Sequence, residues 1–244
     1  MHRFFIPKPF KEEMQITGRD AHHIIDVLRM VPGDRLQVVV DDGISFVGEI
    51  TAVGTNTVTV AAREFLRDSH EPDVRISLLQ GLAKGDKMEF IIQKAVEIGV
   101  TDIYPVAMSH SVVVLESSKA DKKVERWQKI AEAAAKQSKR DSIPTVHEVM
   151  KLDQILQQEK WDLLLVAYES ENQVSLKEVL QSHKEAMTIG VVIGPEGGLS
   201  NEEVAVAKEY GGIAVSLGRR ILRTETAGLV AATAILYETD NLGM

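Results

Sequence analysis

The sequence of 244 residues contains no cysteine. This absence excludes disulfides, thiolate zinc sites, iron–sulfur clusters and a cysteine nucleophile, and it fits a reducing compartment. The chain also lacks any apolar run near the ~20 residues that a membrane span needs. Residues 1–13 show no apolar stretch of the kind found in secretory signals. We therefore expect a soluble, cytoplasmic protein with no membrane partner.

Several familiar catalytic motifs are absent as well. There is no G-x-x-x-x-G-K-[ST] loop, no G-x-G-x-x-G and no G-x-S-x-G, which disfavours nucleotide hydrolysis and the usual serine hydrolase. His147-Glu148 begins like a zinc-protease helix, but Lys151 stands where the second histidine is needed. His22 and His23 are adjacent and point to different parts of a helix surface. We therefore expect no metal site.

Excess positive charge is lacking too, because 36 acidic side chains outnumber 28 basic ones and give a net charge of -8. This total argues weakly against a nucleic-acid partner, but the basic residues are concentrated in two places. Residues 119–140 hold eight basic and three acidic side chains, a local charge of +5. The second cluster is Arg219, Arg220 and Arg223. Either cluster alone fits a solvated surface, whereas the two together favour an anion-binding surface.

The first seventy residues show the short hydrophobic period of β-strands. The predicted strands are Arg35–Val40, Ser45–Val53 and Thr57–Ala62. A helix is predicted over Asp20–Met30, because its apolar residues have helical spacing and a Pro-Gly pair follows. Short strands joined by tight turns indicate a small barrel. The polar segment Asp68–Asp73 is the best candidate for a linker.

After residue 73 the pattern changes to strands that alternate with helices. The predicted strands are Val74–Leu82, Thr101–Ala107, Trp161–Ala167, Met187–Ile193 and Ile213–Leu217. The predicted helices are Lys87–Ile98, Ser118–Lys139, Leu176–Ser182, Ser200–Tyr210 and Thr224–Glu238. Because the strands are apolar on both faces, we expect a mostly parallel sheet with helices on both sides.

Glycine is missing between positions 99 and 190, yet eight of the seventeen glycines fall between positions 190 and 228. Four of these eight lie in two loops, GPEGGLS at 194–200 and LGRRILRT at 217–224. Ligands of a parallel sheet bind beyond the carboxyl ends of its strands, where such loops enter helices. Glycine lets backbone approach a ligand closely. The loops therefore mark a candidate ligand site, with a tight turn made for packing as the alternative.

These loops carry a resemblance to a known family. GPEGGLS and its partner LGRRILRTETA at 217–227 are similar to the two C-terminal motifs of the RsmE family. Those proteins are SPOUT-superfamily methyltransferases that modify N3 of a uridine in small-subunit (16S) ribosomal RNA. The similarity runs through nearly the whole chain, including KGDKME at 84–89 and QKAVEIGV at 93–100. At one position the family usually has arginine, whereas this chain has His110, which carries no permanent charge at neutral pH.

The resemblance implies an α/β fold with two domains. Residues 1–72 would form a PUA-like RNA-binding β-barrel. Residues 73–244 would form a SPOUT methyltransferase domain, with a parallel sheet and a C-terminal trefoil knot. The cofactor would be S-adenosylmethionine, held in the knot by three loops. The substrate would be small-subunit ribosomal RNA or the assembled small subunit.

Site residues are implied by their match to the family motifs. The implied cofactor-binding residues are Tyr168, Glu169, Ile193, Gly194, Pro195, Glu196, Gly197, Gly198, Leu217, Gly218, Ile221, Leu222, Thr224 and Ala227. The implied RNA-binding residues are Arg3, Lys84, Lys87, Lys94, His110, Lys136, Lys139 and Arg140. The catalytic candidates are Arg220, Arg223 and Glu196.

The implied reaction is a displacement at a sulfonium methyl group, which needs N3 held in line and its proton removed. Positioning of this kind contributes on the order of 7–11 kcal/mol, and a cation beside the uridine carbonyls stabilises the resulting anion. Arg220 and Arg223 either supply that cation or clamp phosphate, and Glu196 either accepts a proton or orients a neighbour. Two alternatives stay open, a non-catalytic RNA-binding module and transfer to a ribose 2′-hydroxyl.

The last predicted helix, Thr224–Glu238, is apolar almost all round. A helix on the surface of a monomer should show a polar stripe instead. We therefore expect its own sheet to cover one face and a second copy of the chain to cover another. This agrees with the homodimer that the SPOUT resemblance implies.

Overall fold

The computed structural model describes residues 1–40, 43–66, 70–113 and 117–242. The chain divides into two compact units. The first comprises Met1–Glu71 together with Lys139–Ser142, and the second comprises Pro72–Ser138 and Ile143–Met244. Within the predicted linker, positions 68 and 69 lie outside the described residues. Among the described helices, none combines the length and apolar character that crossing a membrane requires.

The first unit is a five-stranded sheet curled into half a barrel. Its strands are β1 (Arg3–Ile6), β2 (Glu13–Thr17), β3 (Arg35–Val40), β4 (Ser45–Val53) and β5 (Thr57–Leu66). Their order is β1-β3-β4-β5-β2, with β1 parallel to β3 and the other neighbours antiparallel. The predicted bounds of β3 and β4 are confirmed, and β5 extends beyond its predicted end. The short strands β1 and β2 were not predicted from the sequence.

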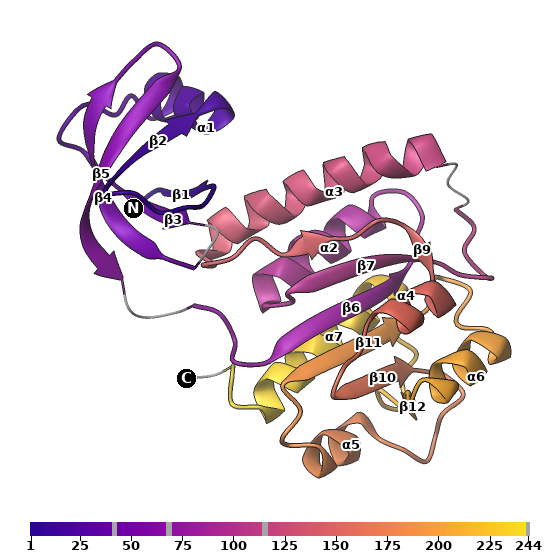
Figure 1. The fold of residues 1–244 in the computed structure, drawn as a ribbon. Coiled ribbons are helices and arrows are strands. Elements are labelled where there is room, and N and C mark those ends of the chain that lie inside the picture. Colours follow the sequence, from indigo (N-terminus) through magenta and orange to yellow (C-terminus); the bar gives the residue numbers. More distant parts are fainter. Residues whose placement is uncertain (41–42, 67–69, 114–116, 243–244) are drawn as a thin grey trace. The chain divides into compact units, whose positions relative to one another are not determined.

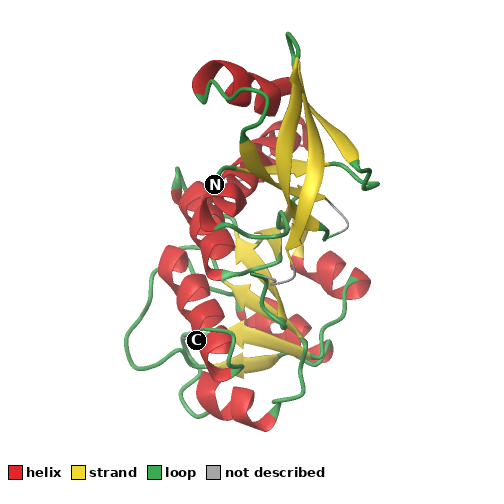
Figure 2. Cartoon of the chain, turned by 90° about the vertical axis from the view of Figure 1, so that its left-hand side faces the viewer, coloured by secondary structure: helices red, strands yellow, loops and turns green. Residues whose placement is uncertain are grey.

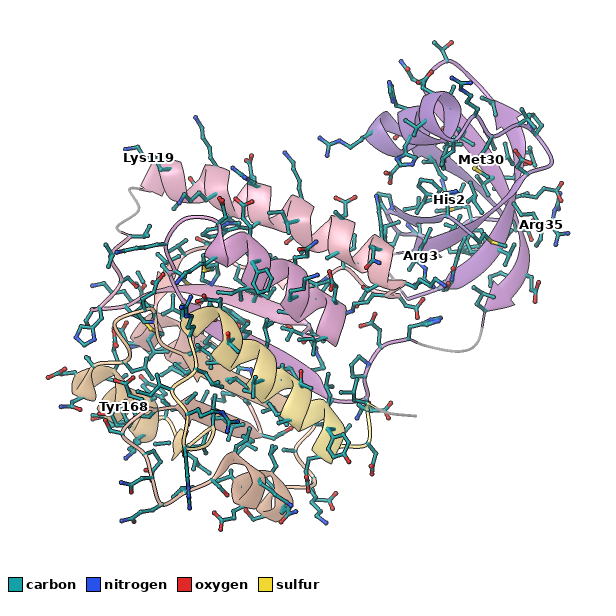
Figure 3. All side chains as sticks on the ribbon, turned by 180° about the vertical axis from the view of Figure 1, so that it is seen from behind. His2, Arg3, Met30, Arg35, Lys119 and Tyr168 are labelled. Carbon is teal, nitrogen blue, oxygen red and sulfur yellow. The ribbon has the colours of Figure 1, made fainter. Side chains whose placement is uncertain are left out.

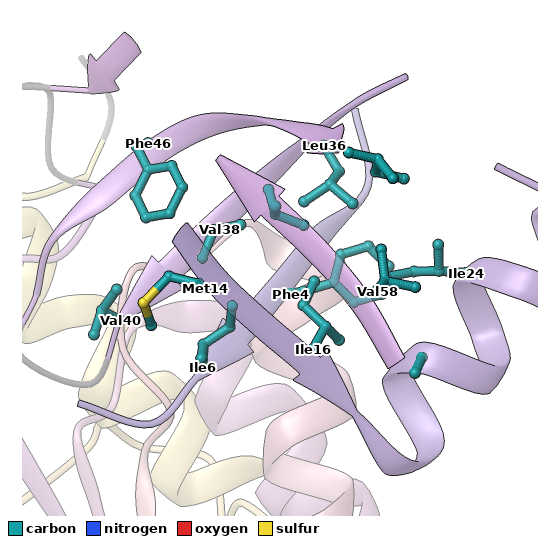
Figure 4. Close-up of a cluster of buried hydrophobic side chains, with 13 residues drawn as sticks. Phe4, Ile6, Met14, Ile16, Ile24, Leu36, Val38, Val40, Phe46 and Val58 are labelled. Carbon is teal, nitrogen blue, oxygen red and sulfur yellow. The ribbon is translucent and has the colours of Figure 1, made fainter. Parts of the chain in front are cut away.

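Alternate side chains of these strands fill the inside of the curl. Phe4, Met14, Leu36 and Phe46 are all buried there (Figure 4). Helix α1 (Gly18–His22) continues into a wider π-type turn, η1 (His23–Val27). The helix predicted over 20–30 therefore starts two residues earlier and ends three residues sooner. Of the apolar residues on which the prediction rested, Ile24 is buried against the sheet and Ile25 and Leu28 are partly buried, whereas Val27 is exposed.

Residues 139–142 belong to the first unit through a network of buried charges. The Arg3 guanidinium donates to two backbone carbonyls of this segment and to Asp141 Oδ1 at 3.1 Å. Arg140 pairs with Glu71, whose Oε1 also accepts the Asp141 amide at 2.8 Å. The side chains of Arg3 and Arg140 are only 3% and 4% exposed. These charges therefore hold a segment that is distant in sequence.

The second unit is a seven-stranded sheet between helices. Its strands are β6 (Arg75–Gly81), β7 (Asp102–Ala107), β8 (Thr145–Val146), β9 (Met150–Lys151), β10 (Leu163–Ala167), β11 (Thr188–Ile193) and β12 (Ile213–Val215). The order is β12-β10-β11-β6-β7-β8, with β9 also paired to β7, and every described pairing is parallel. The predicted fold class is confirmed.

Helices cover both faces of this sheet (Figure 2). They are α2 (Lys87–Ile98), α3 (Ser117–Ser138), α4 (Leu152–Gln158), α5 (Leu176–Ser182), α6 (Asn201–Glu209) and α7 (Thr224–Glu238). Leu79 packs in the core formed with α4 and α6, whereas Leu78 faces α7, where a Cβ on Gly228 would lie 3.0 Å from its Cδ1. This alternation explains why the strands are apolar on both faces. The threading of the trefoil knot stays a prediction.

Candidate functional site

Three neighbouring strands of the second unit end at the same edge of the sheet. Strand β10 lies between β12 and β11, and all three run parallel (Figure 1). The loops that follow them therefore converge beyond their carboxyl ends, the usual ligand position in such sheets. They enclose a cavity of about 430 Å³, within the ~300–1,000 Å³ typical of small-molecule sites.

The cavity brings together most of the residues that the motifs assigned to the cofactor. Its lining includes Tyr168, Glu169, Ile193, Gly194, Pro195, Glu196, Gly198, Leu217, Gly218, Ile221, Leu222, Thr224 and Ala227. Tyr168 follows the end of β10 (Figure 3). Gly197 is not part of the described lining, because it faces His110, whose Cβ would stand 2.7 Å from a Cβ added at 197. Four further lining residues were not singled out from the sequence: Ala167, Leu199, Ser216 and Glu225.

The first glycine loop folds back on itself. The Gly198 amide donates to the Pro195 carbonyl at 3.0 Å, and Gly198 has a φ of +73°, in the left-handed region that favours glycine. A Cβ on Gly194 would lie 2.8 Å from the carbonyl carbon of Gly198, and a Cβ on Gly198 would lie 3.2 Å from Glu169 Oε1. The loop backbone itself therefore forms part of the cavity wall.

A capping box ends this loop and begins α6. The Ser200 hydroxyl accepts the Glu203 amide at 3.2 Å, and the Glu203 carboxylate accepts the Ser200 amide at 2.9 Å. The same carboxylate accepts the Ser109 amide at 2.7 Å. The next residue, His110, is exposed, with its Nδ1 3.3 Å from the Gly198 carbonyl oxygen. The loop after β7 is thereby attached to the first glycine loop.

Lys87 joins two carboxylates at the cavity. Its Nζ lies 3.1 Å from Glu196 Oε1 and 3.2 Å from Glu225 Oε2, and hydrogen bonds to Glu196 and Glu225 raise the Lys87 pKa. Burial works against ionisation of Glu196, but the Lys84 amide, at 3.1 Å, and Lys87 outweigh it and hold the Glu196 pKa below its ordinary value. A carboxylate stabilised in this way is a weaker base. This favours the orienting alternative for Glu196.

The three arginines of the second loop lie at the exposed rim of the cavity. Arg219, Arg220 and Arg223 all belong to its lining. The Arg223 side chain is 83% exposed and its nearest carboxylate, Glu225, is 3.9 Å away. Within the described part of the chain, Arg219 and Arg220 form no ion pair. These guanidinium groups are therefore accessible to an anion or to an entering base.

The predicted RNA-binding residues are divided between the two units. Lys84, Lys87, Lys94, His110 and Lys136 belong to the second unit, and Arg3, Lys139 and Arg140 to the first. Arg3 and Arg140 are buried with their guanidinium groups engaged, whereas Lys139 is exposed. Lys94 pairs with Glu97 and Lys136 with Glu132, both at 2.8 Å. The basic helix α3 begins near the exposed Lys119 (Figure 3). Their roles toward RNA stay predictions.

Comparisons with known proteins cover both units. The chain matches the family described as an RNA methyltransferase domain over residues 70–236 and the RNA methyltransferase PUA domain over residues 16–62. It is 39% identical to ribosomal RNA small subunit methyltransferase E of Bacillus subtilis (strain 168), over 99% of this chain and 98% of that protein. The protein of that name from Mesomycoplasma hyopneumoniae (strain 232) is 30% identical over 98% of this chain and 100% of its own length.

A solved structure is similar over nearly the full length. The crystal structure of a ribosomal RNA small subunit methyltransferase E from Neisseria gonorrhoeae, bound to S-adenosyl methionine, matches with a TM-score of 0.86 at 29% identity. The match covers 97% of each chain. The curled sheet and the parallel sheet with its helices are therefore both shared with a cofactor-bound methyltransferase.

Proposed function

This chain belongs to the ribosomal RNA small subunit methyltransferase E family, S-adenosylmethionine-dependent enzymes, and we propose that its target atom is N3 of a uridine in 16S ribosomal RNA. The observation that carries the proposal is the cavity beyond β10, β11 and β12, which both glycine loops line. The target atom comes from the resemblance of these loops to the RsmE motifs. The reaction class comes from the family.

The residues around the cavity suit S-adenosylmethionine. Ile193, Leu222 and Ala227 supply apolar wall for the adenosine. The glycine loops bring backbone without side chains to the cavity wall, and Glu169 places a carboxylate beside Gly198 for a cationic group. When bound, the cofactor supplies an electrophilic methyl group on a positively charged sulfur. We propose that these residues hold that group at the strand ends.

The exposed arginines supply what the target base needs. The neutral imide nitrogen of uridine has no useful lone pair, so its deprotonated form must be stabilised by nearby positive charge. Arg220 and Arg223 lie at the cavity rim and, by this proposal, one faces the uridine carbonyls. Glu196 keeps Lys87 in place instead of accepting the proton, because its pKa is held low.

We further propose that RNA is bound by the first unit, which contains the PUA match, and by exposed basic residues of α3. The two units correspond to domains with a boundary near residue 72. We also propose a homodimer in which a second copy covers the outer face of α7. That face exposes Val230 by 40% and Tyr237 by 69%, seven residues apart and therefore on the same side of the helix.

Labelled methyl transfer tests the function. The purified chain is given S-adenosylmethionine and either small ribosomal subunits or naked 16S ribosomal RNA, and the digested RNA is mapped by mass spectrometry. We expect a single methylated uridine, with the methyl group on the base. A methyl group on ribose instead would establish 2′-hydroxyl transfer. Binding of RNA without any transfer to either substrate would establish the non-catalytic module.

A further inference from the structure

One buried carboxamide connects the strand ends on which the cavity depends. Gln80, near the end of β6, is fully buried and lies beside Ile193 of β11 in the sheet register. Its Nε2 donates to the Gly81 carbonyl at 3.1 Å and to the Thr224 hydroxyl at 2.8 Å. That hydroxyl in turn donates to the Gly194 carbonyl at 2.7 Å. A chain of hydrogen bonds thus runs from β6 through the start of α7 to the first glycine loop.

The donor and acceptor roles in this chain follow from its chemistry. The Thr224 hydroxyl has one proton, and the Gly194 carbonyl can only accept it. The hydroxyl must therefore receive a hydrogen bond from Gln80, and the Gly81 carbonyl also needs a donor. Only the amide nitrogen of Gln80 can serve both. Its Oε1 then points away, where a Cβ on Gly228 of α7 would lie 3.4 Å from it.

Stability alone does not explain why a carboxamide is buried at position 80. Gln80 Oε1 is buried and has no hydrogen-bond partner among the described residues, and an unsatisfied buried acceptor is unfavourable. An apolar side chain of the same length would remove that penalty, although the Gly81 carbonyl would then lose its Gln80 donor. The carboxamide instead ties Gly194 and Thr224, which both line the cavity and are thirty residues apart in sequence. Buried polar groups that work against stability commonly set geometry at functional sites.

We propose that Gln80 is a positioning residue, which sets the spacing of the two glycine loops around S-adenosylmethionine without touching it. Gln80 is not among the described lining residues of the cavity. It acts through Thr224, and the close packing of Gly81 reinforces the same junction, since a Cβ there would lie 2.6 Å from the Pro195 nitrogen. This inference rests on the proposed function of the cavity.

The test compares affinity with stability. Calorimetry with S-adenosylhomocysteine on Gln80→Met should show a dissociation constant raised by about tenfold, the scale of one to two missing hydrogen bonds. The thermal midpoint should change little, because the variant removes the orphaned Oε1 and at the same time leaves the Gly81 carbonyl without its Gln80 donor. The KM for S-adenosylmethionine should rise while the KM for RNA stays the same. Wild-type affinity in Gln80→Met, or affinity that falls only in step with the thermal midpoint, would overturn the proposal.

A double-mutant cycle adds a readout that a general packing defect would not produce. Thr224→Val removes the hydroxyl with little change of shape and should also raise the dissociation constant by about tenfold, whereas Thr224→Ser should restore most of the affinity. Because both residues belong to one chain of bonds, Gln80→Met with Thr224→Val should be no weaker than either alone. If the increases in the dissociation constant from the two substitutions multiply in the double variant, the proposal is contradicted. Failure of the wild-type chain to bind the probe would instead contradict the proposed function.

Discussion

At the scale of single residues, the cavity is governed by charge and by backbone conformation. Lys87 lies between Glu196 and Glu225, so one positive charge serves two negative ones beside the site. Gly198 sits at a positive φ that other residues adopt only with strain. Each feature predicts a separate change in ligand binding.

Replacing Lys87 should change the ratio of the affinities for S-adenosylmethionine and for its product, S-adenosylhomocysteine. Lys87→Met leaves two carboxylates without their shared cation, which makes the cavity more negative. S-adenosylmethionine carries a sulfonium charge that S-adenosylhomocysteine lacks, so the ratio of their affinities should move toward the cofactor by about two- to fivefold. Calorimetry with both ligands measures the ratio. Lys94→Met on the same helix, where lysine pairs with Glu97, serves as the control, and an equal shift there would contradict the assignment.

Substitution of Gly198 should reduce both the stability of the protein, through backbone strain, and the affinity for the ligand. Gly198→Ala should destabilise the protein by about 1–2 kcal/mol, the cost of a side chain in the left-handed region. It should also weaken S-adenosylhomocysteine binding by about tenfold or more, because the new Cβ stands 3.2 Å from Glu169 Oε1 at the cavity. Gly198→Val should reduce both stability and affinity further.

The matched control for that prediction is Gly211→Ala. Gly211 has a φ of +82° with open space around its Cβ position and does not belong to the described cavity lining. It should show a similar decrease of stability in urea unfolding and unchanged calorimetric affinity. Unchanged affinity in the Gly198 variants as well would remove the first glycine loop from the ligand site.

At the scale of elements, the segment 139–142 shows how a few buried charges decide where a piece of chain belongs. Helix α3 ends at Ser138 in the second unit, and the next four residues pack with the first unit. Lys139 makes this change of direction at a φ of +61°. The packing of the segment depends on Arg3, Glu71 and Arg140, and buried ion pairs of this kind fail when one partner is removed.

Arg140→Gln should therefore destabilise the first unit by about 3–5 kcal/mol. Arg63→Gln, which breaks an exposed pair with Glu49 in the same unit, should have little effect. Urea unfolding followed by circular dichroism measures both. Equal, small decreases of stability in the two variants would mean that the buried pair does not hold the segment.

The same pair predicts an acid dependence. Burial opposes ionisation of Glu71, but the Arg140 side chain outweighs it and holds the Glu71 pKa below its ordinary value of 4.5. A lowered folded-state pKa contributes stability that is present above pH 4.5 and is lost as the pH falls through the lower folded value. Unfolding curves between pH 6 and pH 3 should show this decrease in the wild type and a smaller slope in Arg140→Gln.

The basic helix α3 and the residue that follows it make a further prediction. Lys136→Gln with Lys139→Gln should weaken RNA binding and reduce its salt dependence by up to ~0.7–0.9 log units for each phosphate group that these lysines neutralise. Arg140, although part of the same basic run, is left unchanged because it is buried. Lys177→Gln with Lys184→Gln removes the same charge elsewhere. If RNA binding has the same salt dependence in the two double variants, Lys136 and Lys139 are solvated surface charges that do not contact RNA.

At the scale of the whole molecule, the proposed homodimer leads to a prediction about α7. Ala231 is 1% exposed within its own subunit, so a glutamate there would disrupt the core, whereas Val230 is 40% exposed. Val230→Glu should therefore dissociate the dimer and abolish transfer. Met187→Glu, at another exposed apolar position, should leave the mass unchanged. Light scattering supplies the measurement, and a wild-type mass of one chain with intact activity would contradict the dimer.

The sequence by itself determined the fold class and most of the cavity. Strand periods, apolar runs and helix ends depend on residues a few positions apart, so β3, β4 and α7 were found with their bounds. A two-residue strand such as β8 carries too little pattern to be predicted. The glycine loops were found because a positive φ or a close approach restricts the residue type locally.

Only the tertiary structure decided which charges are buried and which groups meet. From the sequence alone Arg3 is expected to be an exposed cation, but in the structure it pairs with Asp141, 138 positions away. Gln80 is a polar residue in an otherwise apolar strand, and only the structure shows that Thr224, 144 positions away, accepts its hydrogen bond. Burial and pairing depend on these long-range contacts, which no local pattern encodes. The motifs thus located the site, and the packing of distant segments assigned Lys87, Glu225 and Gln80 their places in and around it.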